Sequence, residues 1–265
     1  MSGHGARVNV RRAIGLALYA AAAALALLAC AQTNRAAPSP AGGSRLATPP
    51  ALPPILWTDD FLGVTVDPRY AQSVTGTGAI KIAEGGMQGG AVVLGATGSG
   101  AGVARLRLGE EASTGKGDVR GFSVERHVVL QARVMLNTTE HVAVTIGFVG
   151  PNDDQHALAA IYNTDASPTW QLQAHNGALS SQTQVDTQFR HTAGAWTVIE
   201  LATETSDGAP TATLLIDGQA RGVVTGPAVP LTGLVPELQV WNRPAGDGWQ
   251  QTSLYVDYLQ VRQDR

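Results

Sequence analysis

The chain has 265 residues, of which 15% are charged and 44% hydrophobic, with a formal net charge of −3, 31 glycines, 14 prolines and one cysteine. This composition excludes a disulfide-stabilised scaffold, a collagen-like repeat and a basic nucleic-acid-binding protein, so we expect no nucleic-acid partner. Lysine occurs only as Lys81 and Lys116. A chain with so little charge and so much glycine, alanine, valine and threonine is typical of an exported β-protein.

Residues 1–29 have the pattern of a secretory signal peptide. A basic region that contains Arg7, Arg11 and Arg12 precedes the apolar stretch 13–28, which is too short to span a bilayer comfortably as a helix. The next residues, Leu27-Leu28-Ala29-Cys30, resemble the lipobox of bacterial lipoproteins, in which the cysteine is lipidated and becomes the mature N-terminus. The resemblance implies an exported protein with a lipid anchor on Cys30, at the outer membrane or the outer face of the plasma membrane. The alternative is an ordinary cleavage site beside a chance cysteine.

Residues 30–54 are rich in proline and alanine and show no periodic apolar pattern. Proline favours extended polyproline II conformation, which stiffens a linker without giving it a core. We therefore predict a disordered tether between the signal helix and a folded domain over 55–265.

The segment 55–265 shows no helical period, but many short runs have period two or are rich in β-branched residues. The predicted strands are 76–82, 91–94, 103–108, 122–136, 141–149, 156–163, 169–175, 196–203, 211–216, 237–241 and 253–261. Asn176-Gly177 and Asp217-Gly218 are typical of two-residue hairpin turns. About 11 to 14 strands over this length predict an all-β, two-sheet antiparallel sandwich.

The order of several motifs resembles the concanavalin A-like lectin and glucanase jelly rolls, which include laminin G-like modules. Trp196 opens the strand before the Ile216-Asp217-Gly218 hairpin, and the last strand contains Val256-Asp257-Tyr258. The resemblance covers roughly 61–261 and implies a jelly-roll fold. Because this fold carries lectins, adhesion modules, glycoside hydrolases and polysaccharide lyases, it does not by itself select a function.

The glucanase branch carries Glu-x-Asp-x-x-Glu on one strand, because residues two apart face the same side and can flank a glycosidic bond. No acidic residue in this chain has another acid two positions away. A retaining glucanase of that type is therefore disfavoured, although carboxylates from different strands remain an alternative.

The alginate-lyase branch shows a thinner resemblance. Gln173-Ala174-His175 is similar to its Gln-Ile/Val-His motif, and Glu125-Arg126 lies upstream, where that family keeps an Arg/Glu/Arg strand. The family's third motif, near the C-terminus, is missing. The resemblance makes His175, Gln173, Glu125 and Arg126 the candidate catalytic residues, while the alternative is that His175 is a polar strand-end residue.

Metal and cofactor signals are few. The histidines show no ligand spacing for a transition metal. Asp153 and Asp154 offer oxygen ligands suited to structural calcium, and a plain turn after Pro151 is the alternative. We expect no other cofactor.

The residues best suited to bind sugar surround the loop 244–248. Sugar-binding sites combine aromatic rings, which cover apolar ring faces, with amides and charged groups that bind hydroxyls. The candidate ligand-binding residues are Trp241, Asn242, Arg243, Trp249, Trp170 and Tyr162. The alternative places Trp241 at the end of a core strand and Trp249 over the sandwich edge, and Trp57 and Trp196 are expected in the core.

Together these features favour a monomeric, lipid-anchored surface protein with a non-catalytic carbohydrate-binding or adhesion domain, whose partner is a polysaccharide or other glycan. One alternative is a polysaccharide-degrading enzyme of the same fold. A second is a structural envelope protein without a small ligand.

Overall fold

The computed structural model describes residues 54–83, 90–97, 100–109, 121–150, 156–177, 182–245 and 248–264. They belong to a compact unit that spans 51–265. The predicted signal peptide, Cys30, nearly all of the tether, and Asp153 with Asp154 lie outside the described residues. Within the described ranges, no helix is long and apolar enough to cross a membrane.

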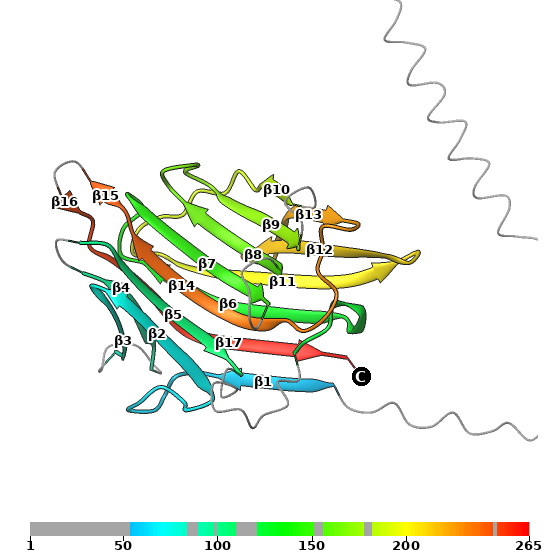
Figure 1. Ribbon diagram of the computed structural model, residues 1–265, viewed down its shortest axis with the longest axis horizontal. Helices are drawn as coiled ribbons and strands as arrows, with labels where there is room; N and C mark the ends of the chain where they lie inside the picture. The colour runs from blue at the N-terminus through cyan, green and yellow to red at the C-terminus, as the bar shows by residue number, and fades with distance from the viewer. Residues whose placement is uncertain are drawn as a thin grey trace, which may run out of the picture. The chain divides into compact units, whose positions relative to one another are not determined.

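The larger sheet, called sheet A, has eight strands. Seven follow one another in the order β13 (Gln219–Thr225), β12 (Ala209–Ile216), β11 (Trp196–Ser206), β6 (Val128–Leu136), β17 (Thr252–Gln263), β4 (Val92–Ala96) and β3 (Gly78–Ile82). The eighth, β1 (Ile55–Asp59), pairs with the C-terminal half of β17. Strand β17, drawn in red, therefore lies beside β6 and β1, which are distant in the sequence (Figure 1).

Sheet B has seven strands in the order β10 (Thr183–Asp186), β9 (Trp170–Asn176), β8 (His156–Asn163), β7 (Val142–Val149), β14 (Val235–Asn242), β5 (Gly102–Leu108) and β2 (Tyr70–Gly76). Every pairing in both sheets is antiparallel. A two-stranded ribbon, β15 (Pro244–Ala245) with β16 (Gly248–Trp249), and a short 3-10 helix, η3 (Val124–Arg126), complete the described elements.

The core lies between the two sheets and is built by alternating side chains. On β6 the odd-numbered positions Gln131 and Arg133 are half-exposed, whereas Leu130 and Ala132 are fully buried, as period two predicts. Trp57 packs, partly buried, against this core, as expected. Trp196 does not, and that prediction was wrong. The inward positions of β11 are taken by Ile199 and Leu201, so Trp196 lies half-buried on the opposite face, 5.0 Å from the Arg133 guanidinium.

Of the two predicted two-residue hairpin turns, one is confirmed and the other is wrong. Asp217-Gly218 joins β12 to β13 with φ of 50° and 75°, the positive values that such turns require. Asn176 instead belongs to β9, and β10 begins only at Thr183, so that connection is longer than two residues. A turn that sequence analysis missed, Asp207-Gly208, joins β11 to β12 with φ of 52° and 77°. Its Asp-Gly pair was the available signal.

The predicted all-β, two-sheet sandwich is confirmed, with slightly more strands than expected. Eight and seven strands in the two sheets exceed the predicted range. The additional ones include β2, β10 and β13, which lie at sheet edges. β10 has only four residues, and the polar residues of β2 and β13 hide the alternation that marks a half-buried strand.

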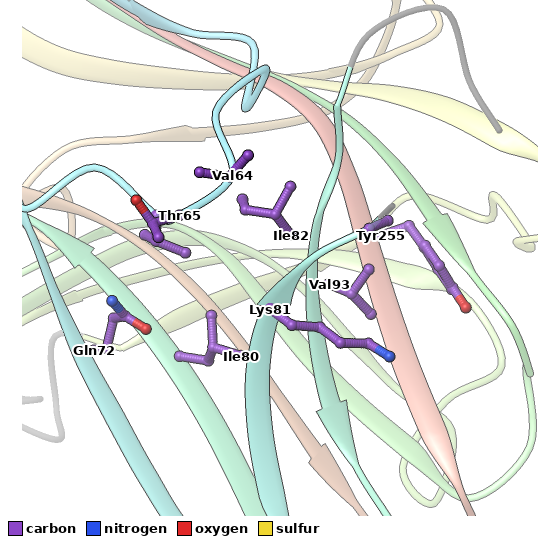
Figure 2. Close-up of a pocket in the computed structure, with 10 residues that line it drawn as sticks. Val64, Thr65, Gln72, Ile80, Lys81, Ile82, Val93 and Tyr255 are labelled. Carbon is purple, nitrogen blue, oxygen red and sulfur yellow. The ribbon is translucent and has the colours of Figure 1, made fainter. Parts of the chain in front are cut away.

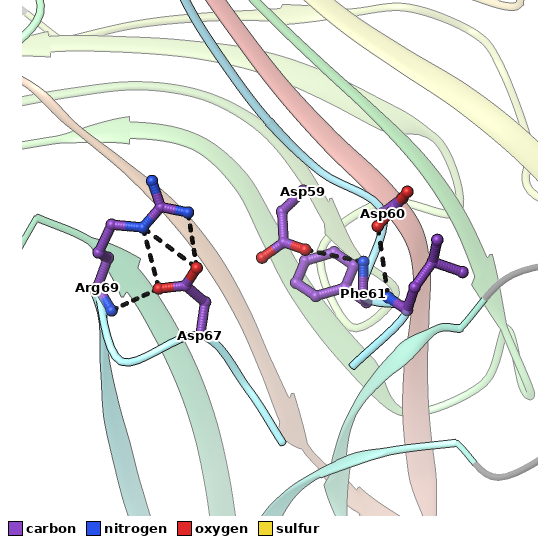
Figure 3. Close-up of polar contacts among 6 residues, drawn as sticks. Asp59, Asp60, Phe61, Asp67 and Arg69 are labelled. Carbon is purple, nitrogen blue, oxygen red and sulfur yellow. Dashed lines mark hydrogen bonds and ion pairs between the residues drawn. The ribbon is translucent and has the colours of Figure 1, made fainter. Parts of the chain in front are cut away.

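The connection between β1 and β2 crosses from sheet A to sheet B. Asp59 Oδ1 accepts a hydrogen bond from the Phe61 N–H at 2.8 Å, and Asp60 Oδ1 accepts one from the Leu62 N–H at 3.4 Å (Figure 3). Farther on, the Asp67 carboxylate binds the backbone N–H and the guanidinium of Arg69. The adjacent acids Asp59 and Asp60 therefore form turns.

Candidate functional site

Two of the predicted sugar-binding aromatics are core residues. Trp170 and Tyr162 are 0% and 2% exposed, and their ring centroids lie 5.3 Å apart between the sheets. Their strands alternate so that these positions face inward, together with Leu172 and Ala160. The prediction that Trp170 and Tyr162 contact a ligand is therefore corrected.

The candidates Gln173, His175 and Trp241 lie on the side of sheet B that faces away from sheet A, which we call the outer face of sheet B. Directly opposed residues in antiparallel strands project to the same side. One row across this face contains Gln171, Ile161, Thr145, Gln239, Arg105 and Ser73. The next row contains Gln173, Ala159, Gly147, Glu237, Arg107 and Ala71. Long polar side chains thus flank a central strip of uncharged residues on β8 and β7.

An electrostatic network joins β5 and β14 on this face. The Arg105 Nε donates to Gln239 Oε1 at 3.0 Å and lies 3.4 Å from Glu237 Oε2. The Arg107 Nε also donates to Glu237 Oε2. Glu237, Gln239 and Arg107 are each at most 5% exposed. The carboxylate is thus held between two guanidinium groups.

Acid–base hydrolysis of a glycosidic bond needs two carboxyl groups about 5 to 9.5 Å apart. On the described strands of this face the acids are Glu237 on β14 and Asp186 on β10. Three strands separate these two, which places them about 19 Å apart across the sheet. The described strands therefore present no carboxylate pair with hydrolytic spacing.

Trp241 extends the outer face of sheet B by a third row, between Ala143 and Val103. It is half-buried, and the Arg243 guanidinium lies 5.3 Å from its ring centroid. Asp165 Oδ2 is 3.7 Å from the Arg243 Nε. Trp249, also half-buried, pairs with Pro244 in the adjoining ribbon.

Asn242 points the other way and is a structural residue, which corrects its prediction as a ligand contact. It is 3% exposed. Its Oδ1 accepts a hydrogen bond from the Gly102 N–H at 2.7 Å, and its Nδ2 donates to the Gly100 carbonyl at 3.0 Å. The side chain fastens the end of β14 to the start of β5.

The four candidate catalytic residues are not brought together. Gln173 and His175 lie on the outer face of sheet B, and the His175 Nε2 is buried without a hydrogen-bond partner in the described part of the chain. Glu125 and Arg126 lie in η3, which leads into β6 of sheet A and packs near β11. The predicted combination of these four residues is therefore wrong.

Sequence analysis missed Arg105, Glu237 and Gln239 as members of this face. The signal was the alternation of charged or amide residues with aliphatic ones in 103–108 and 235–241. Alternation alone identifies a strand with one polar side, but it does not show which strands are neighbours.

A groove of about 860 Å³ lies at another place, beside the edge strand β3 (Figure 2). Its walls are mostly aliphatic, and its polar side chains include Gln72, Lys81 and Tyr255. No carboxylate is among its described lining residues. Elsewhere in the described ranges, no three His, Cys, Asp or Glu residues are grouped so that they could hold a metal ion.

These two antiparallel sheets form a jelly-roll sandwich of the concanavalin A-like type, as the motif order implied. The endo-1,3-β-glucanase from Streptomyces sioyaensis matches with a TM-score of 0.58 at 14% identity, over 86% of this chain and 99% of that one. The endo-β-1,3-glucanase from Pyrococcus furiosus matches at 0.55 and 13% identity, over 79% and 94%. The carbohydrate recognition domain of Emp47p matches at 0.53 and 12% identity, over 78% and 94%.

At these identities the likeness shows the fold alone. No protein-family model matches the sequence, and no curated protein matches it.

Proposed function

We propose that the domain is a non-catalytic carbohydrate-binding or adhesion module that holds a polysaccharide or other glycan against the outer face of sheet B. One observation carries this proposal: the half-buried hydrogen-bonding side chains of Gln171, Thr145 and Arg105 lie in one row across the sheet beside the Trp241–Arg243 stack, without a carboxylate pair at hydrolytic spacing on the described strands.

The chemistry of the row suits sugar hydroxyls. The amides of Gln171 and Gln173 and the hydroxyl of Thr145 each combine donor and acceptor atoms, and they project on the same side. The Trp241 ring, which lies beside the Arg243 guanidinium, adds an aromatic surface of the kind that covers the apolar face of a pyranose. The solved structures of similar fold include a carbohydrate recognition domain and glucanases, which agrees with a glycan partner.

A polysaccharide-degrading enzyme is the second candidate, and His175 is the observation that favours it. Its imidazole lies on the same face as Gln173, and its Nε2 has no described partner. A neutral imidazole can act as a general base, as removal of a proton beside a uronate carboxyl would require. Arg105 lies on this face as well and could offset the charge of such a carboxyl.

The experiment combines binding with a product assay on the full chain. Soluble β-1,3-glucan and mixed-linkage glucan serve as neutral probes, and alginate serves as an acidic probe. We expect Gln171→Ala and Trp241→Ala to weaken binding at the outer face of sheet B at least tenfold, whereas Gln219→Ala, at the start of β13 in sheet A, leaves it unchanged.

New reducing ends or unsaturated products would show that the domain is an enzyme and not a binding module, especially if His175→Ala abolished them. A lack of binding to all probes would favour the structural envelope protein.

We also infer that a lipid on Cys30 and the segment 30–54 display this domain at the cell envelope. The support is the lipobox-like sequence and the proline content of the segment. Cys30→Ser should release the protein from the membrane fraction. Retention of this variant would contradict the anchor.

A further inference from the structure

We propose a second glycan-binding surface on the opposite side of the sandwich, where Trp196, Tyr255 and Tyr258 surround the Arg133–Asp257 ion pair on the outer face of sheet A. It is separate from the outer face of sheet B and shares no residue with it. We call it the sheet A strip.

The strip follows the register of five neighbouring strands. Trp196 on β11 opposes Met135 on β6, which opposes Tyr255 on β17, and the row continues through Val93 on β4 to Lys81 on β3. Because opposed residues project to one side, all five face away from sheet B. From β11 to β3 the row crosses four strand spacings, or about 19 Å. That length suits an extended chain rather than one small molecule.

The far end of the row enters the groove beside β3. Tyr255, Val93 and Lys81 line that groove, and Figure 2 shows Tyr255 and Lys81 on the same side of β3. The strip is therefore an aromatic platform that continues into a hollow with polar groups. Flat aromatic surface followed by a cavity with hydrogen-bonding groups is the combination that glycan sites use.

A β-bulge concentrates polar groups at the centre of the strip. The register shifts between Val256 and Tyr258, so that Asp257 and Tyr258 together oppose Arg133. Asp257 Oδ2 lies 2.6 Å from Arg133 Nη1, and the Arg133 guanidinium is 5.0 Å from the centroid of the Trp196 ring. Bulges of this kind redirect side chains and are frequent beside functional sites.

Hydrogen bonds hold the next side chains in fixed positions. The Tyr258 hydroxyl donates to Gln131 Oε1 at 3.0 Å, and the Gln131 Nε2 donates to Glu200 Oε2 at 2.7 Å. The half-buried aromatic and polar groups are thus ordered before a ligand arrives, which lowers the entropy cost of binding.

The charges identify the ligand as a neutral polyhydroxylated chain. Arg133 is paired with Asp257, and the positive charge of Lys81 at one end of the row is matched by the negative charge of Glu200, so neither sign of charge dominates the strip. A charged polymer would therefore gain little there. The aliphatic side chains exposed elsewhere on this face, Leu56 and Val223, lie on the outlying strands β1 and β13. The strip thus lacks the contiguous aliphatic patch that a second copy of the chain would bury.

Binding surfaces on both sheets would make the domain bivalent. One molecule could then hold two polysaccharide strands, or two parts of one strand, with the avidity that two sites provide.

The test is a titration of the full chain with soluble mixed-linkage glucan as the neutral probe and alginate as the acidic one. The variants are Trp196→Ala and Tyr255→Ala in the strip, Trp241→Ala on sheet B, and the combination of Trp196→Ala with Trp241→Ala. Tyr255→Leu keeps apolar volume where Tyr255→Ala fails to fold, and Thr213→Ala, on sheet A outside the strip, is the matched control. Urea unfolding verifies that each variant is folded.

We expect Trp196→Ala and Tyr255→Ala to halve the number of neutral-glucan sites per chain, to leave alginate titrations unchanged, and to abolish cross-linking of glucan by the protein. The double variant should lose all neutral-glucan binding. If the strip variants bind like the wild type while Trp241→Ala abolishes binding, the second surface is wrong and the sheet B proposal stands. If only the strip variants lose binding, the sheet B proposal fails and the strip stands.

Two other outcomes would contradict the proposal that the sheet A strip binds glycan. One is that strip variants change the oligomeric state in size-exclusion chromatography, which would make this face an interface between copies. The other is that no probe binds the wild-type chain.

Discussion

The Glu237 carboxylate on β14 accepts a hydrogen bond from the Arg107 guanidinium on β5, and both side chains are almost completely removed from solvent. Removing one partner of a buried ion pair leaves a desolvated charge with less compensation. We expect Glu237→Gln to lower the free energy of unfolding by about 3 kcal/mol. Urea unfolding measures this loss.

The control for Glu237→Gln is Glu204→Gln, an exposed acid on β11 of sheet A, which should change stability by only a few tenths of a kcal/mol. Equal effects of the two substitutions would show that the Glu237–Arg107 pair contributes nothing to the fold.

His191 should make stability depend on pH. Burial lowers the pKa of His191 from its usual 6.5, while the Asp217 charge raises it less. The Leu136 N–H donates to its Nε2 at 3.4 Å, which requires that nitrogen to be unprotonated. The unfolded chain therefore takes up a proton more readily than the folded one as the pH falls below 6.5. Stability should decrease in that range by at most about 1.4 kcal/mol per pH unit.

The measurement is the urea midpoint of wild type and His191→Gln between about pH 7.5 and pH 5. The variant should be less stable at the upper end but should show a shallower slope. A slope identical to that of the wild type would assign the pH dependence to other groups.

Gly218 tests the hairpin between β12 and β13. Its φ is +75°, and an added Cβ would have no heavy atom within 4 Å. Gly218→Ala should therefore lose only backbone energy, about 1 kcal/mol, because a left-handed conformation disfavours any residue with a Cβ. The control is Gly100→Ala, where the added Cβ also has no neighbour within 4 Å and φ lies outside the left-handed region. A loss as large at Gly100 would contradict this explanation.

Substitutions of Asn242 and of its neighbour Arg243 should distinguish a structural role from a ligand contact. Asn242→Ala removes the acceptor of the buried Gly102 N–H and the donor to the Gly100 carbonyl, which should cost about 1 to 3 kcal/mol. Glycan affinity per folded molecule should remain unchanged. Arg243→Ala should show the reverse: weaker binding, because the Trp241 ring loses its stacked partner, with a smaller effect on unfolding. Thermal unfolding and glycan titration on the same samples distinguish the two.

Part of this architecture could be predicted because its signals are local. The alternation in 128–136 gave β6 and its buried face correctly, and Asp217-Gly218 gave its hairpin. The same reasoning failed for Asn176-Gly177, because Asn176 pairs with a residue of the neighbouring strand and so belongs to β9. Local preference is overruled when backbone groups gain partners in a neighbouring strand.

The antiparallel sandwich follows from the sequence alone, because period two and turn residues act over a few neighbours. The side of each strand that faces the core, in contrast, depends on how the strands pair in the folded domain. Trp170 is inward and Trp196 outward, although both open strands, since sheet pairing sets the direction and a bulge such as Asp257-Tyr258 resets it. Tertiary structure likewise brought Arg105 beside Gln239, because cross-strand hydrogen bonding joins residues that no spacing along the chain connects.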